Sequence, residues 1–210
     1  MKNKLRLGWD TKFNEGASMQ KENRKYYEAY EDRYKTAHEK GVSWEQMKNT
    51  PIVMDIINRY HLHPEQSLLE IGCGEGRDSA TVLENGFHLM ATDISPEAID
   101  YCKKKMPDFE SKFMVLDCLS SDLNEKFDFI YSIAVVHMFV LDEDRNGFYQ
   151  FIRSHLKSDG IALICSMGDG NYEIQSDISC FLFTLRSWSV ITAVKTAVRH
   201  LFEDSDNRKR

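Results

Sequence analysis

The chain has 210 residues, of which 42% are hydrophobic and 29% are charged, and its formal net charge is −6. This length suits one well-buried domain and is short for two, and the composition excludes both a disordered chain and a membrane-embedded bundle. The acidic balance argues against a nucleic-acid partner, because a phosphate backbone calls for clustered Lys and Arg.

The cysteines and the two ends of the chain indicate a cytoplasmic protein. Five cysteines are scattered without a C-x-x-C pair, which fits reduced thiols. The start MKNKLRLGWD has no apolar core for a signal peptide. The most apolar late stretch, 178–202, is broken by Arg186, Lys195 and Arg199, so we expect no transmembrane helix and no membrane partner.

Residues 1–49 form a polar, aromatic-rich extension. Within the run YYEAYEDRYKTAHEKG, tyrosines recur at helical spacing, and Gly41 is a plausible helix stop. The recurring residues are Tyr26, Tyr27, Tyr30 and Tyr34. The pattern predicts an amphipathic helix that packs its rings on the core.

A second helix is predicted over Pro51–Tyr60, with four apolar residues on one face and Thr50 as its cap. His61 and His63 follow this helix two positions apart. No third ligand accompanies them at the spacing of a metal site, so we expect no metal.

The sequence is organised around SLLEIGCGEGRDS, Ser67 to Ser79, which predicts a buried strand, a glycine turn and a helix start. The apolar run from Leu68 to Ile71 is typical of an interior parallel strand. Glu70 interrupts that run, and a buried carboxylate is costly unless something pairs with it. We therefore expect Glu70 to point into a site.

Gly72, Gly74 and Gly76 occupy alternate positions after this strand. Such glycines serve where the backbone needs positive φ or must approach a ligand closely. Ligands of open parallel sheets bind outside the carboxyl ends of the strands, beside the free N–H groups of a helix start. A dinucleotide fingerprint would need glycine at Arg77, and no Lys follows Gly76 as a phosphate loop requires, so both phosphate interpretations are weakened.

Strands and helices alternate through the rest of the centre. Strands are predicted at Phe87–Thr92, Phe113–Leu116, Phe127–Ile133 and Ile161–Ser166, and helices at Arg77–Asn85, Pro96–Lys105 and Asp142–Leu156, with a turn at Ser158–Gly160. This order predicts an α/β fold with a doubly wound, mostly parallel sheet.

Asp93 closes the second strand, seventeen positions beyond Gly76. A nucleotide-binding unit places near this position the acid that accepts both hydroxyls of a ribose. The alternative is that Asp93 caps the next turn, because Ser95-Pro96-Glu97 is itself a strong helix start. We favour the ribose role.

Two motifs together resemble a known family. E-x-G-x-G-x-G within GCGEGRDS, with the later FDFIYSIAVVHMF, resembles the class I S-adenosylmethionine (SAM) methyltransferases, in their small-molecule branch that includes the tellurite-resistance enzymes. The resemblance covers roughly Val53–Met167 and implies SAM as cofactor. Because SAM presents an ammonium group and no phosphate, Glu70 suits the ammonium.

The resemblance also implies further roles. It places Asp117 at the adenine amino group and the backbone N–H of Cys118 on the ring, whereas the alternative for Asp117 is a plain loop carboxylate. For the N-terminal helix it offers an alternative to packing on the core, namely a lid over the cofactor that excludes water. Trp44, just beyond that helix, is a candidate for an aromatic wall near a sulfonium through cation–π attraction.

The fourth strand would end beside the transferable methyl group. His137 is then the best-placed titratable side chain for a substrate, although a purely structural histidine is as plausible. Met138 and Phe139 would line an apolar wall or belong to the core. A general base matters only for a nucleophile that must lose a proton.

The C-terminal part departs from the family, whose members end with an antiparallel strand pair. From Ser187 to Phe202 the apolar positions follow helical spacing, and EDSDNRKR is a charged tail. We expect residues 50–170 to form the SAM-binding core and 171–210 to be largely helical without that strand pair. An uncovered sheet edge would favour a homodimer.

The leading hypothesis is a SAM-dependent methyltransferase that acts on a small molecule, mainly by positioning the acceptor for in-line displacement. Two alternatives stay open. One is a SAM-binding regulatory or inactive module, and the other is a nicotinamide-dependent oxidoreductase, against which Arg77 counts.

Overall fold

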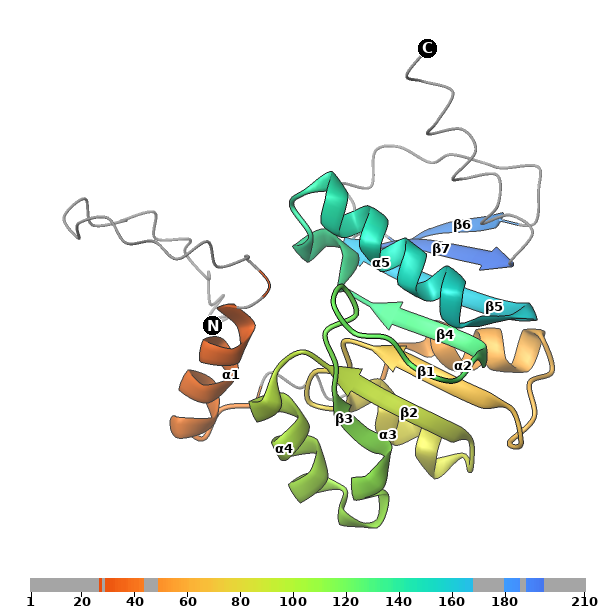
Figure 1. The fold of residues 1–210 in the computed structure, drawn as a ribbon. Helices are drawn as coiled ribbons and strands as arrows, with labels where there is room; N and C mark the ends of the chain where they lie inside the picture. Colours follow the sequence, from red (N-terminus) through yellow and green to blue (C-terminus); the bar gives the residue numbers. More distant parts are fainter. Residues whose placement is uncertain (1–26, 28, 44–48, 168–179, 186–187, 195–210) are drawn as a thin grey trace, which may run out of the picture.

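The computed structural model describes residues 27, 29–43, 49–167, 180–185 and 188–194 (Figure 1). Its helices are α1 (Ala29–Glu39), α2 (Pro51–Arg59), α3 (Arg77–Glu84), α4 (Pro96–Lys105) and α5 (Asp142–His155), with 3-10 turns η2 (Pro107–Lys112) and η3 (Val136–Met138). Its strands are β1 (Ser67–Ile71), β2 (His88–Asp93), β3 (Phe113–Val115), β4 (Phe127–Ile133), β5 (Leu156–Met167), β6 (Cys180–Leu185) and β7 (Trp188–Val194).

The strands form one seven-stranded sheet in the order β3-β2-β1-β4-β5-β7-β6. Strands β1 to β5 pair in parallel, whereas β7 runs antiparallel to both β5 and β6. The strand order reverses between β1 and β4, and a ligand site is expected outside the carboxyl ends of the strands at such a switch point. The predicted doubly wound, mostly parallel sheet is confirmed.

Alternate residues of the central strands serve two separate apolar cores, one on each face of the sheet. Leu68 belongs to the core that contains the buried residues of α2, α3 and α4, and its neighbour Leu69 belongs to the core under α5. Figure 1 shows these helices covering the two faces. Burial on both faces explains why β1 is apolar at nearly every position, as its sequence predicted.

The prediction that the final antiparallel strand pair is missing is wrong. Strands β6 and β7 pair with each other, and β7 pairs with β5 along its length, from Ile161↔Val194 to Met167↔Trp188. The consecutive β-branched residues Val190, Ile191 and Thr192 favour the strand. Because β7 covers the edge of β5, the expected reason for dimerisation does not arise there; residues 195–210 lie outside the described part.

A second difference concerns Ser158–Gly160, which was predicted to be a turn before the fifth strand. In the structure β5 begins at Leu156 and includes this segment. Phe127 of β4 pairs with Leu156, and Phe129 pairs with Ile161, so the β5 strand carries extra residues between the two pairs. The turn residues are therefore accommodated as an irregularity within the strand.

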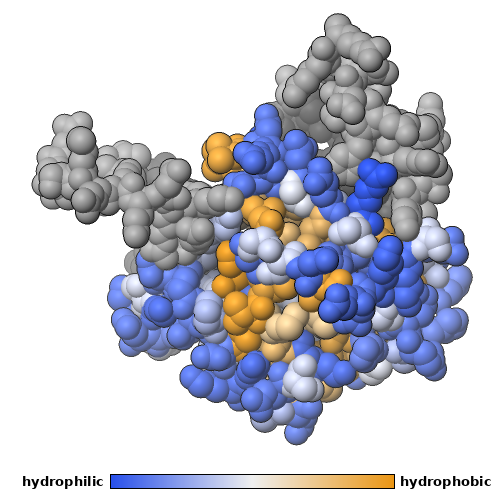
Figure 2. All heavy atoms as spheres, in the orientation of Figure 1, coloured by the Kyte–Doolittle hydropathy of each residue, from blue (hydrophilic) through white to orange (hydrophobic). Residues whose placement is uncertain are grey.

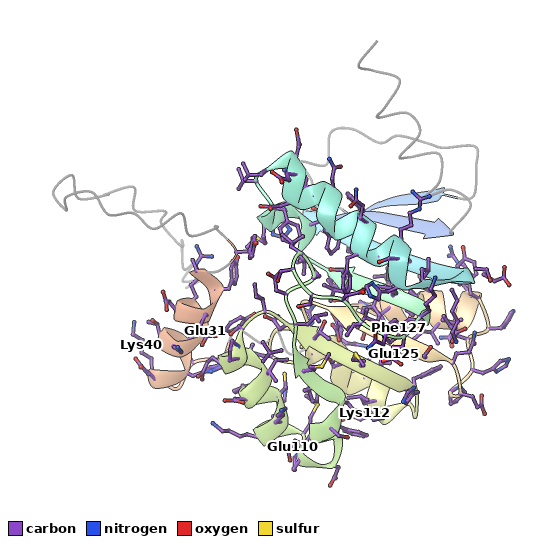
Figure 3. All side chains as sticks on the ribbon, viewed as in Figure 1. Glu31, Lys40, Glu110, Lys112, Glu125 and Phe127 are labelled. Carbon is purple, nitrogen blue, oxygen red and sulfur yellow. The ribbon has the colours of Figure 1, made fainter. Side chains whose placement is uncertain are left out.

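Helix α1 lies beside α4 (Figure 1) and contacts its N-terminal end through hydrogen bonds. Glu31 of α1 accepts hydrogen bonds from the Ser95 hydroxyl and from the Glu97 N–H, the latter at 3.2 Å, and Figure 3 shows Glu31 on the side of α1 that faces α4. The His38 ring stacks on Tyr101, with 4.6 Å between ring centroids. These contacts fix α1 against α4.

Candidate functional site

A cavity of about 580 Å³ opens at the carboxyl ends of β1, β2 and β4. Its lining comes from the loop after β1, the residues that follow β2, β3 and β4, and three tyrosines of the N-terminal segment. Figure 2 shows apolar side chains gathered in the middle of the viewed face between hydrophilic surfaces. The volume lies in the range of small-molecule and cofactor sites.

The glycine turn has the backbone that the sequence predicted, because Gly72, Gly74 and Gly76 have φ values of 78°, 54° and 77°. Gly74 lines the cavity, and a Cβ there would lie 2.9 Å from the Tyr34 hydroxyl. Gly76 is not part of the lining, and its Cβ would lie 2.9 Å from Cys102 Sγ. Gly76 therefore serves the packing of the turn on α4, whereas Gly72 and Gly74 form the cavity wall.

Glu70 reaches the cavity from the end of β1 although it is only 2% exposed. Its Oε2 accepts hydrogen bonds from the Tyr131 hydroxyl at 2.9 Å and from Ser79 Oγ at 2.5 Å. Burial raises the pKa of Glu70 to about 8, and the nearby Asp78 carboxylate adds to this effect. The interruption of an apolar strand by an acid was the sequence signal for this placement.

Next to Glu70 lies a second buried acid, which the sequence reasoning had missed. Asp78 is 4% exposed and accepts hydrogen bonds from Thr50 Oγ1 at 2.9 Å and Arg77 at 2.9 Å. The Thr50 hydroxyl therefore bonds to Asp78 and makes no cap bond to α2, contrary to the predicted role. The Arg-Asp pair directly after the glycine run was the available signal.

Asp93 lines the cavity at the end of β2 and is 8% exposed. Its Oδ2 accepts from Gly74 N at 2.8 Å, and its Oδ1 accepts from Ser95 N at 2.9 Å. Burial raises the pKa of Asp93 against the opposing effect of these N–H donors. The bond to Ser95 is the turn contact of the alternative interpretation, and further lone pairs on both oxygens stay available to a diol.

Asp117 and Cys118 meet the same cavity after β3. Asp117 accepts from Leu119 N at 2.9 Å and from Ser120 Oγ at 2.8 Å, so its carboxylate organises its own loop. Burial raises the pKa of the Cys118 thiol to about 12. A thiol of this kind is unreactive, so the polar groups that Cys118 offers to the cavity are those of its backbone.

His137 lies in η3 and lines the same cavity. Its Nδ1 is buried, and no group in the described part of the chain bonds to it. Burial lowers the pKa of His137, so the imidazole is neutral at pH 7. Met138 and Phe139 line the adjoining wall and are also buried in the core under α5, so both interpretations of these residues hold.

The N-terminal helix does more than pack on the core. Tyr27, Tyr30 and Tyr34 line the cavity, and the Tyr27 ring meets the Phe139 ring edge-on at 5.3 Å between centroids. The Tyr30 hydroxyl donates to the Met138 sulfur at 3.5 Å. Tyr26 and Trp44 lie outside the described residues.

A further contact ties this helix to the glycine turn. His38 lies with Nε2 3.0 Å from Glu75 Oε1 and Nδ1 2.7 Å from Glu97 Oε1, and the Ser43 hydroxyl donates to Glu75 at 2.6 Å. Burial alone would lower the pKa of His38, but the hydrogen bonds with Glu97 and Glu75 raise it above its ordinary value. No sequence motif marks this cluster, because its members come from three segments.

The lining fits SAM better than a pyrophosphate. Three acids at successive strand ends, Glu70, Asp93 and Asp117, line the cavity together with the backbone of Gly72 and Gly74. Carboxylates suit an ammonium group, a ribose diol and a purine amino group, whereas they repel phosphates. Among the described residues, no group of three or more His, Cys, Asp or Glu is placed to hold a metal ion.

The sheet order, the glycine turn after β1 and the acids at successive strand ends are those of the class I SAM-dependent methyltransferase fold. Residues 69–162 match the protein family described as "Methyltransferase domain". This stretch runs from β1 into β5, so it includes the glycine turn and every acid of the cavity.

Curated relatives agree with this class. The chain is 28% identical over 126 residues to a malonyl-[acyl-carrier protein] O-methyltransferase of Acetivibrio thermocellus, and the match covers 59% of this chain and 42% of the relative. It is 34% identical over 76 residues to the enzyme of the same name from Anoxybacillus flavithermus, covering 35% and 29% of the two chains. The chain therefore spans less than half the length of these relatives.

Solved structures share the fold. A TehB-like SAM-dependent methyltransferase from Corynebacterium glutamicum superimposes with a TM-score of 0.52 at 22% identity, over 79% of this chain and 96% of that one. The glycopeptide N-methyltransferase MtfA gives a TM-score of 0.53 at 16% identity, over 75% and 84%. None of the described helices is long and apolar enough to span a membrane.

Proposed function

We propose that the chain transfers a methyl group from SAM to a small-molecule acceptor. The observation that carries this proposal is one cavity that is lined both by the acids at three strand ends and by His137. The match of residues 69–162 to a methyltransferase family supports the same reaction. The relatives are named for O-methylation and N-methylation, which supports an acceptor with an oxygen or nitrogen nucleophile.

Each acid has a proposed part in holding the cofactor. Glu70 pairs with its ammonium group, Asp93 accepts from its ribose hydroxyls, and Asp117 accepts from its adenine amino group while the Cys118 N–H faces the ring. Gly72 and Gly74 line the same cavity, which supports a methionine chain lying along the turn. These assignments explain why the acids line a single cavity.

The cofactor supplies a methyl group on a sulfonium, which already is a good leaving group. The chain's own contribution is to orient the acceptor and to keep water out, for which the apolar wall of Met138 and Phe139 and the tyrosines of the N-terminal segment are suited. His137 is proposed as the general base. Its neutral imidazole lines the cavity, which supports proton uptake from an acceptor O–H or N–H.

The test begins with cofactor binding. S-adenosylhomocysteine at about a hundred times its dissociation constant should stabilise the protein by roughly 2.7 kcal/mol, which is several degrees in melting temperature, and NAD should have no effect. No shift from a folded sample would refute the proposal, and a shift with NAD alone would revive the oxidoreductase. Binding without methyl transfer to any acceptor would identify a regulatory module.

His137→Gln provides the second step. Because burial lowers the pKa of His137, kcat should rise with pH through a pKa below the ordinary 6.5 and stay level above it. The variant should lose about a hundredfold in kcat and lose that inflection, while its affinity for S-adenosylhomocysteine stays unchanged. An unchanged profile would remove His137 from the reaction.

We also propose a cytoplasmic location, which the free thiols of Cys73, Cys102, Cys118 and Cys165 support, and a homodimer that gel filtration can test.

A further inference from the structure

The buried end of the cavity holds more acid than base. Glu70 and Asp78 are both almost completely buried, at 2% and 4% exposure, and the cation beside them is Arg77. The Arg77 guanidinium lies 2.9 Å from Asp78 and donates also to the Thr50 hydroxyl at 2.7 Å. If both carboxyls were ionised, the group would carry an excess negative charge in a buried place, which is strongly unfavourable.

The hydrogen bonds show which acid is left without its own cation. Asp78 takes the ion pair with Arg77 and two hydrogen bonds from Thr50, its N–H at 2.5 Å and its hydroxyl at 2.9 Å. Glu70 instead receives two neutral hydroxyl donors, Tyr131 and Ser79. Glu70 is therefore the acid of the pair that has no cation of its own, and its raised pKa of about 8 means that it retains a proton at pH 7.

The donors to Glu70 are held by the sheet itself. Tyr131 is the direct register partner of Glu70 across the β1–β4 pair, and its side chain is fully buried. Ser79, which is also fully buried, projects from α3. Both hydrogen bonds end on the same oxygen, Oε2, and neither involves Oε1. The carboxyl group thus has a fixed orientation at the cavity wall.

We propose that binding of the cofactor's ammonium group releases one proton from Glu70, and that Tyr131 and Ser79 are positioning residues for the carboxylate that forms. The inference rests on the proposed function, since it takes SAM as the ligand. The arriving ammonium supplies the second cation that the Glu70–Asp78–Arg77 group lacks. The proton leaves Glu70 for the solvent, and the site then holds two carboxylates against a guanidinium and an ammonium.

Few other titratable groups face Glu70. The groups that interact with it from the packed elements are Arg77 and Asp78 of α3, Tyr131 of β4 and Cys73 of the glycine turn. The hydrogen bond with Cys102, together with burial, raises the pKa of the Cys73 thiol well above its ordinary value, and burial does the same to the pKa of the Tyr131 hydroxyl, so both stay protonated. Glu70 is therefore the group whose charge changes near neutral pH.

The test is isothermal titration of the full chain with S-adenosylhomocysteine at pH 7 in phosphate and in Tris, two buffers with different ionisation enthalpies. The difference in binding heat gives the number of protons released, which we expect to be close to one. The dissociation constant should fall about tenfold per pH unit between pH 6 and pH 7 and level off near pH 8. This measurement needs no variant.

Variants then locate the proton. Glu70→Gln should bind S-adenosylhomocysteine more weakly than the wild type at pH 8 and should release no proton. The difference between the two dissociation constants should become smaller as the pH falls. Tyr131→Phe should weaken binding at pH 7 by about three- to tenfold and still release a proton, because a lost charge-assisted hydrogen bond disfavours the carboxylate. Ser132→Ala is the matched control, since Ser132 Oγ donates to the Ile71 carbonyl at 2.9 Å and not to Glu70.

The outcomes separate this inference from the proposed function. Binding with the same heat in both buffers would overturn the proton coupling and leave the methyltransferase proposal standing. Proton release that persists in Glu70→Gln would overturn the assignment to Glu70. An absence of binding by a folded wild type would overturn the proposed function and this inference together.

Discussion

Replacing Glu70 by Gln should change the stability of the ligand-free protein in a pH-dependent way. Burial raises the pKa of Glu70 from an ordinary 4.5 to about 8, so between these values the folded state holds a proton that the unfolded state has lost. The contribution of Glu70 to stability is therefore fully present below about pH 4.5 and is lost as the pH rises to about 8. Glutamine keeps the shape and cannot ionise.

The size of the effect follows from the shift. Each pH unit in this window should cost the wild type about 1.4 kcal/mol relative to Glu70→Gln, and the whole window about 3 to 5 kcal/mol. The unfolding free energy of both proteins can be measured by urea denaturation at pH 5, 6, 7, 8 and 9. The difference between them should move steadily in favour of the variant and become constant above about pH 8.

Asp128→Asn is the matched control. Asp128 is a carboxylate at the opposite end of the sheet and is bonded to Ser67 N at 2.8 Å and Lys157 Nζ at 2.7 Å. Hydrogen bonds and the Lys157 charge lower the pKa of Asp128 although burial opposes them, so its contribution is lost only as the pH falls through acidic values. Its curve should run parallel to the wild type from pH 5 to pH 9. Parallel curves for Glu70→Gln as well would refute the idea of a protonated buried acid.

Three further changes test other parts of the structure. Gly76→Ala should destabilise by about 2 to 5 kcal/mol in urea, since it adds overpacking to left-handed strain, whereas Gly86→Ala should cost only about 1 to 2, because its Cβ meets nothing within 4 Å; equal costs would contradict the packing role. Because the pKa of His38 is raised, its protonated ring should hold α1 most firmly below pH 6.5, the ordinary pKa, and α1 should loosen as the pH rises through the raised value. Amide exchange in α1, corrected for intrinsic rates, should become faster over that range, and His38→Ala should not show this change. Burial raises the pKa of Cys118 and Cys165 to about 12, so iodoacetamide should label their peptides only in urea, and labelling of the native protein would contradict their burial.

The parts of the fold that sequence could predict are those fixed by neighbouring residues. The bounds of α4 were predicted as they stand, because Pro96 opens the helix and Ser95 Oγ accepts from Ala98 N at 3.1 Å. β1 was likewise predicted, because its apolar run ends at a glycine. The candidate site was predictable to the same extent: Glu70 and Asp93 end parallel strands, and the carboxyl ends of such strands meet at one edge of a sheet.

What the sequence left out depends on contacts between distant segments. Tyr131 lies within an apolar strand and has no motif of its own; only the pairing of β4 beside β1 brings it to Glu70. The prediction for the C-terminal strands was wrong for a related reason. β7 has 7 residues, and the spacing of apolar residues in so short a stretch does not distinguish a helix from a strand. The open edge of β5, a tertiary feature, decides it. Glu70 and its hydroxyl donor Tyr131 are therefore brought together only in the folded sheet. The number of protons released on ligand binding, and not a sequence motif, can show whether the two residues act together.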